Sequence, residues 1–140
     1  MKKTQKRLGN KGFSLVELIV VIAIMAVLVG VLAPTLIRNV EKSRESKDAQ
    51  NIDSIKNVIE VALQNEDAYQ EAITKGDVIT FNDTNEAVIA TTGLPSFTSE
   101  FNSTLDLSKS TLTSKEYKGK RANIKFNVSS TGTVTVKGLN

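Results

Sequence analysis

The sequence predicts an α+β protein in which a long N-terminal α-helix packs against a small head built on an antiparallel β-sheet. Three observations predict this fold. A run of 25 almost entirely apolar residues extends from Phe13 to Ile37. Apolar side chains then recur at helical spacing to about Lys75. Near the C-terminus, residues 124–136 alternate between apolar and polar side chains, as strands with one buried face do.

These patterns divide the chain into four parts. They are a leader (1–12), the apolar half of the helix (13–37), a neck with the amphipathic half of the helix (38–75), and a small β head with a C-terminal hairpin (76–140).

Composition excludes several kinds of chemistry. The 140 residues include no cysteine, no histidine and no tryptophan. Disulfides and thiolate catalysis are therefore excluded, and the usual general base and the commonest zinc ligand are missing. No phosphate-binding glycine loop or catalytic triad stands out. We expect a non-enzymatic protein with no catalytic residue, no cofactor and no metal.

The positive net charge belongs to the first residues and not to the body of the chain. The net charge is +3, but the first 12 residues carry five cations and no acid. The rest of the chain has 13 basic and 15 acidic residues. This balance disfavours nucleic acid as a partner, without excluding it, because no basic domain face is indicated.

The leader and the apolar run have the pattern of a targeting signal. Residues 1–12 are polar and cationic, and 13–37 are long enough to cross a bilayer as a helix, which takes about 20 residues. The cations before the run predict an N-terminus inside the cell and the residues after Ile37 outside it.

Three interpretations of this segment compete. A cleaved secretory signal needs a site such as Val31-Leu32-Ala33, but Pro34 would follow the cut and the apolar run is too long. A plain membrane anchor leaves Glu17 unexplained, at a cost on the order of 2.5–3.5 kcal/mol for a charge at mid-membrane. In the third, cleavage after Gly12 creates an amine at Phe13, and Glu17 lies one helical turn away at i+4.

The residues Lys11-Gly12-Phe13-Ser14-Leu15-Val16-Glu17-Leu18, followed by an apolar helix with Pro34, resemble the class III signal of type IV pilins and pseudopilins. The resemblance covers about residues 8–40. It implies that a prepilin peptidase cuts between Gly12 and Phe13 and N-methylates Phe13. It also implies that Glu17 pairs with the N-terminal amine of an adjacent subunit.

The resemblance further implies partners and a location. The chain would be a single-pass membrane protein, N-terminus in and C-terminus out, until the pilus assembly machinery polymerises it. It would then form a homo-oligomeric helical filament outside the cell. The alternatives are a pseudopilin of a secretion or competence system, or a membrane-anchored binding module. The absence of a C-terminal cysteine pair departs from many Gram-negative pilins.

Gly30 and Pro34 predict a kink in the helix. Proline donates no backbone hydrogen bond, and its ring crowds the carbonyl four residues earlier, which belongs to Gly30. Glycine is itself a poor helix former.

The neck is predicted to be solvated. Residues 38–48 are almost entirely polar, and Arg44 stands at helical spacing from both Glu41 and Asp48. An apolar face then follows, which we assign to the core of the head. Its members are Ile52, Ile55, Ile59, Ala62, Leu63, Tyr69 and Ile73. We expect one helix from Phe13 to about Lys75, closed by Gly76.

In the head, 78–81 and 87–90 are possible strands, and Gly93-Leu94-Pro95 predicts a turn. Residues 124–128 and 134–136, joined by a turn at 129–132, predict a terminal hairpin. The middle segment, 96–121, has no firm period, and we expect a loop with one strand near Leu112.

Two polar clusters are candidates for binding. Residues 82–86 (Asn-Asp-Thr-Asn-Glu) are rich in oxygen ligands, but such runs more often form a polar turn. The basic cluster of Lys115, Lys118, Lys120 and Arg121 around Tyr117 is most simply a solvated loop.

Overall fold

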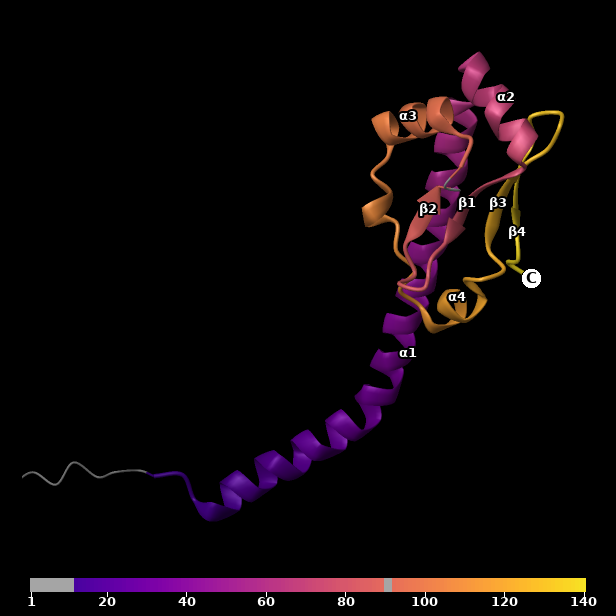
Figure 1. The fold of residues 1–140 in the computed structure, drawn as a ribbon. Coiled ribbons are helices and arrows are strands. Elements are labelled where there is room, and N and C mark those ends of the chain that lie inside the picture. The colour runs from indigo at the N-terminus through magenta and orange to yellow at the C-terminus, as the bar shows by residue number, and fades with distance from the viewer. Residues whose placement is uncertain (1–11, 90–91) are drawn as a thin grey trace, which may run out of the picture. The chain divides into compact units, whose positions relative to one another are not determined.

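The computed structural model describes residues 12–89 and 92–140. Residues 1–11 of the predicted leader, and Ala90 of a predicted strand, lie outside the described residues. The fold is α+β, as predicted: a long N-terminal helix and a small antiparallel sheet (Figure 1). The chain divides into two compact units, Met1–Arg38 and Asn39–Asn140.

The first unit holds the apolar part of helix α1 (Leu15–Ala62). Its most apolar 18-residue window has a mean hydropathy of 3.1, and none of it is buried. Within the described residues this helix is long and apolar enough to cross a membrane. The helical assignment runs through Gly30 and Pro34. The kink at these residues stays a prediction.

The second unit begins with the rest of α1, whose predicted apolar face is confirmed. Ile52, Ile55, Ile59 and Ala62 are all buried. The prediction of one helix to about Lys75 is wrong, because α1 ends at Ala62 and a separate helix α2 (Glu66–Lys75) follows.

The break between α1 and α2 has a local cause. The side chain of Asn65 accepts hydrogen bonds from the N–H groups of Asp67 (3.0 Å) and Ala68 (3.2 Å). An asparagine that satisfies the first free amides of a helix has an extended backbone itself, so it starts a new helix. Helix α2 ends at Gly76 as predicted, with φ of 79° and its N–H bonded to the carbonyl of Ala72 at 2.9 Å.

The head contains one four-stranded sheet in the order β2-β1-β3-β4, with every neighbouring pair antiparallel. The strands are β1 (Asp77–Phe81), β2 (Ala87–Ile89), β3 (Lys125–Val128) and β4 (Val134–Lys137). The predicted terminal hairpin is confirmed, with Phe126 opposite Val136 and Val128 opposite Val134. Its turn contains Gly132 at φ of 78°, where an added Cβ would lie 2.6 Å from the Tyr69 ring.

The predicted loop at 96–121 is wrong. This segment forms α3 (Pro95–Thr104), the 3₁₀ turn η1 (Leu107–Lys109) and α4 (Lys115–Lys120). The strand expected near Leu112 is reduced to a bridge between Thr111 and Glu86. Phe97 and Phe101, one turn apart on α3, are both fully buried with ring centroids 5.9 Å apart.

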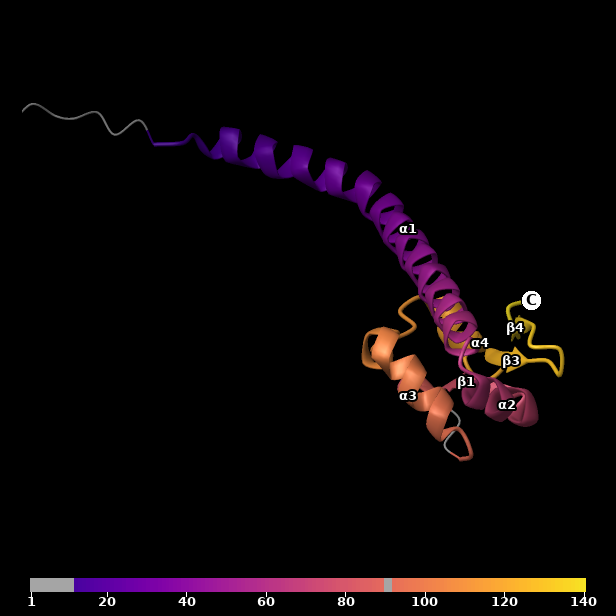
Figure 2. The same ribbon diagram turned by 90° about the horizontal axis from the view of Figure 1, so that it is seen from above.

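The core of the second unit joins α1, α2, α3 and the sheet. Helices α2 and α3 lie beside one another, as both views show (Figures 1 and 2). Helix α4 lies at the opposite end of the head. The largest apolar side chains that are fully buried are Phe97, Phe101, Phe126, Ile55, Ile59, Ile79, Leu112 and Ile124.

Candidate functional site

The start of α1 places Glu17 against its own backbone. Ser14 precedes the first helical residue, and its N–H donates to Glu17 Oε2 at 2.8 Å. The Leu18 N–H donates to the Ser14 carbonyl at 3.2 Å. A glutamate at the third helical position that reaches back to the capping residue forms half of a capping box. In the uncut chain the carboxylate of Glu17 therefore has a hydrogen-bond donor of its own.

Phe13 and Glu17, which the sequence places one helical turn apart, lie close together. They line one shallow hollow on the helix surface with Leu18 and Val21. The Phe13 residue is 93% exposed. Gly12 and Phe13 have irregular, exposed backbone before the helix, and an added Cβ at Gly12 would meet nothing within 4 Å. Gly12 and Phe13 are thus both exposed among the described residues.

Gly30 and Pro34 do not join this site. Both are exposed, and they lie more than three helical turns after Glu17. An added Cβ at Gly30 would meet nothing within 4 Å, so the space around this turn is free for another molecule.

The predicted solvated neck is wrong at Asp48, which is fully buried. Its carboxylate accepts hydrogen bonds from the Thr113 N–H (2.9 Å), the Thr113 hydroxyl (3.0 Å) and the Ser114 N–H (2.8 Å). A signal for this was present, because Asp48 lies one turn before Ile52 on the same face as the apolar stripe.

A second acid of the neck binds the same segment. The Lys115 N–H donates to Glu41 Oε1, so two carboxylates of α1 hold the start of α4. Glu41 also lies 3.7 Å from Arg44, which confirms that predicted pair. Among the described residues Arg44 forms no ion pair with Asp48, because Asp48 faces inward.

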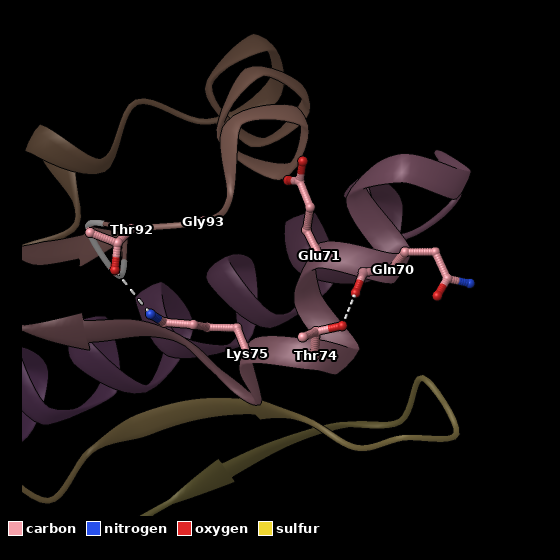
Figure 3. Close-up of a pocket in the computed structure, with 6 residues that line it drawn as sticks. All are labelled: Gln70, Glu71, Thr74, Lys75, Thr92 and Gly93. Atoms are coloured by element: carbon pink, nitrogen blue, oxygen red, sulfur yellow. Dashed lines mark hydrogen bonds between the residues drawn. The ribbon is translucent and has the colours of Figure 1, made fainter.

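A hollow beside α2 is lined by groups that bond to one another within the head (Figure 3). The Glu71 carboxylate accepts from the N–H groups of Ser96 (3.2 Å) and Phe97 (2.9 Å), and so caps α3. Partial burial would raise the pKa of Glu71, but these hydrogen bonds together hold that pKa below its ordinary value. Lys75 donates to the Thr92 hydroxyl at 3.2 Å.

Side chains of both polar clusters make hydrogen bonds or ion pairs within the head. The Asn82 side chain accepts from the N–H groups of Thr84 (3.0 Å) and Glu86 (2.9 Å), which confirms the predicted polar turn. Hydrogen bonds from Asn82 and then Thr84 lower the pKa of Glu86. The basic cluster predicted as a loop is helical, and Lys120 pairs with Glu116 at 3.0 Å.

Comparison with known proteins identifies the N-terminal signal. A family profile described as the prokaryotic N-terminal methylation motif matches residues 7–33. The curated "Prepilin peptidase-dependent protein A" of Clostridium perfringens (strain 13 / Type A) is 35% identical over 77 residues, or 55% of this chain and 54% of the relative. The chain therefore spans about half the length of the curated relative it matches. No solved structure matches.

The methylation motif identifies a class III signal, and the exposed apolar helix is long enough to anchor a chain in a membrane. Together with the α+β fold, these features make the chain similar to proteins of the pilin or pseudopilin type.

Proposed function

We propose that this chain is the precursor of a structural subunit of a type IV pilus. Prepilin peptidase cuts between Gly12 and Phe13 and methylates the new amine of Phe13. The pilus assembly machinery then polymerises the subunit through residues 13–37. Before assembly the chain spans the membrane once, with its N-terminus inside and its head outside. Afterwards it is part of an extracellular homo-oligomeric filament.

One observation carries this proposal: among the described residues, none of the most apolar window of α1 is buried. Val16, Ile22 and Val29 are 66%, 55% and 63% exposed, and the whole window is unburied. Burying a side chain of this kind contributes about 1.5–3 kcal/mol. A membrane covers such a surface before assembly, and equivalent helices of neighbouring subunits cover it afterwards.

Glu17 supplies the specific contact. In the precursor its carboxylate accepts the Ser14 N–H. Cleavage adds a positive amine at Phe13, and a carboxylate in apolar surroundings is stabilised when an ammonium group pairs with it. Pairing between subunits sets the axial position of one helix against the next.

The mature N-terminus tests the proposal. We expect mass spectrometry of the surface-exposed protein to find Phe13 as the first residue, carrying one methyl group. Electron microscopy should find filaments that contain this chain. An intact leader on the surface-exposed protein would overturn the proposal in favour of a membrane-anchored binding module.

A pseudopilin would be cleaved and methylated in the same way. The presence or absence of long surface filaments therefore distinguishes the two alternatives. A pseudopilin predicts the processed N-terminus without long surface filaments, together with a secretion or DNA-uptake defect on deletion. Long filaments built from this chain at its normal expression level would exclude it.

A further inference from the structure

We propose that the base of the head, where residues 41–48 of α1 meet the start of α4, carries a cationic collar. This collar binds the anionic head groups of membrane phospholipids. This inference rests on the membrane-inserted precursor proposed above. It concerns the second unit alone, and it assigns a binding surface to side chains that the filament contact does not use. The collar consists of Lys42, Arg44, Lys47, Lys115 and Lys118.

Two of the three acids among residues 41–48, Glu41 and Asp48, point inward, and the third, Glu45, is half-buried, whereas the cations stay outside. Asp48 and Glu41 face the backbone amides of residues 113–115. All five collar residues are exposed. Within the part of the chain that the structure describes, Arg44 is the one collar member in an ion pair, a long one with Glu41. The nearby acid Glu116 is paired with Lys120 instead.

The two inward acids also fix α4 beside α1. The hydrogen bonds from Ser114 to Asp48 and from Lys115 to Glu41 hold the start of α4 at the level of residues 41–48. Lys115 and Lys118 therefore lie at the same level along α1 as Lys42 and Lys47. The acids thus place additional cations in the collar.

The cations surround the helix and do not share one face. Lys42 and Lys47 are five residues apart, which is about 140° around the helix axis. The collar residues of α4 lie on the side that Asp48 and Glu41 face. A membrane surface, which meets every side of a helix that leaves it, fits this arrangement better than a second copy of the chain, which would contact one side.

The distance from the apolar segment also favours the membrane. Lys42 follows Ile37 by five residues, about 7.5 Å along a helix and at most about 18 Å for any conformation. The head-group layer is about 5–7 Å thick on each side of the hydrocarbon, and charges act over a Debye length of about 8 Å. Each Lys or Arg near an anionic surface strengthens binding by about fivefold.

A single fluorescent label tests the collar. The chain has no cysteine, and an added Cβ at Gly119 in α4 meets nothing within 4 Å. The full chain with Gly119→Cys is labelled and placed in lipid nanodiscs, one copy each, with a quencher on the lipid head groups. We expect several-fold stronger quenching with phosphatidylglycerol than with phosphatidylcholine alone, and loss of the difference at high salt.

Two charge-matched triple variants isolate the collar. Lys42→Gln, Lys47→Gln and Lys118→Gln together are expected to reduce quenching to the phosphatidylcholine level. Lys56→Gln, Lys75→Gln and Lys109→Gln remove the same charge outside the collar and should leave quenching unchanged. Equal quenching in both lipids, or an unaffected collar variant, would overturn the inference.

Two further outcomes separate the competing explanations. Quenching that appears only in discs loaded with two copies, whatever the lipid charge, would assign the collar to contacts between subunits. That result would overturn the lipid proposal. Flotation of the unmodified chain with phosphatidylcholine vesicles tests membrane anchoring independently. Failure to float would overturn the proposed precursor itself, whereas flotation without charge-dependent quenching would overturn only the collar.

Discussion

At the scale of single residues, Asp48 connects α1 to the start of α4. Its buried carboxylate accepts hydrogen bonds from three donors, namely the N–H and hydroxyl of Thr113 and the N–H of Ser114. Each buried donor left without an acceptor costs about 1–3 kcal/mol. We expect Asp48→Ala to lower the free energy of unfolding by about 2–4 kcal/mol, measured by thermal denaturation of the full chain in detergent.

The matched control is Asp53→Ala. Asp53 is an exposed aspartate on the same helix, and its removal should change stability by no more than about 0.5 kcal/mol. Asp48→Asn keeps one acceptor oxygen and should fall between the two. We call the hydrogen bonds between Asp48 and the start of α4 the clamp. If Asp48→Ala were as stable as the control, this clamp would not contribute to stability.

Glu71 should make stability depend on pH. Its folded-state pKa lies below the ordinary value of 4.5. The ionised form therefore stabilises the fold above that value, and this stabilisation is lost as pH falls through the folded-state pKa. We expect the wild type to melt at a higher temperature than Glu71→Gln at neutral pH, with the difference shrinking in acid.

A pH series of melting temperatures from about pH 3 to pH 7 measures this effect. The difference between wild type and variant isolates Glu71 from the other acids. Glu60→Gln removes a carboxylate at an exposed position on α1, and this control variant should change the melting temperature little at neutral pH. A difference for Glu71→Gln that stays constant with pH would show that the charge of Glu71 does not contribute to capping α3.

At the scale of elements, Asn65 separates two helices that the apolar pattern joins. Its side chain caps α2 at two amides. Loss of an N-cap costs about 0.5–2 kcal/mol. We expect Asn65→Ala to destabilise the head by that amount and to speed amide exchange at Asp67 and Ala68. Asn65→Asp keeps the acceptor but replaces the amide that donates to Glu100 at 3.0 Å with a second carboxylate, so it should retain only part of the stability. Gln64→Ala should have little effect.

The elements that the sequence predicted correctly are those whose signal is local. Alternation at Phe126 and Val128 predicted the hairpin, and spacing at Ile52, Ile55 and Ile59 predicted the buried face of α1. Helix α3 was missed because its residues are mostly Ser, Thr and Asn, which are weak helix formers. Its cap comes from Glu71, about 25 residues earlier.

In the candidate site, too, the residues predicted correctly are those with a local signal. Gly12, Phe13 and Glu17 form one contiguous motif, so the sequence alone indicated them. The role of Asp48 depends on amide donors 65 and 66 residues away. Its spacing from Arg44 indicated a surface ion pair. Its position one turn before Ile52 was a local signal of burial, but the donors that its carboxylate binds, in Thr113 and Ser114, follow from the fold alone.

At the scale of the whole molecule, Glu17 connects folding to assembly. We expect both Glu17→Ala and Glu17→Gln to abolish or sharply reduce filaments while the precursor still inserts. The glutamine variant is informative because its side-chain oxygen can still accept the Ser14 N–H, but it carries no charge to pair with an amine. Filaments counted by electron microscopy, with membrane-inserted precursor measured in parallel, test this.

Glu60→Ala removes an exposed acid elsewhere on α1 and should leave filament numbers unchanged. Filaments of normal number from Glu17→Gln would mean that capping, not charge, is the function of Glu17. Normal filaments from Glu17→Ala would remove Glu17 from assembly altogether.

The clamp between Asp48 and the start of α4 also sets an order of events during synthesis. The acceptor is made 65 residues before its first donor. A ribosome adds about 5–20 residues per second, so Asp48 precedes Thr113 by about 3–13 s. During that interval the helix already has its carboxylate but nothing to bury it against. The base of the head therefore closes late, when α4 arrives.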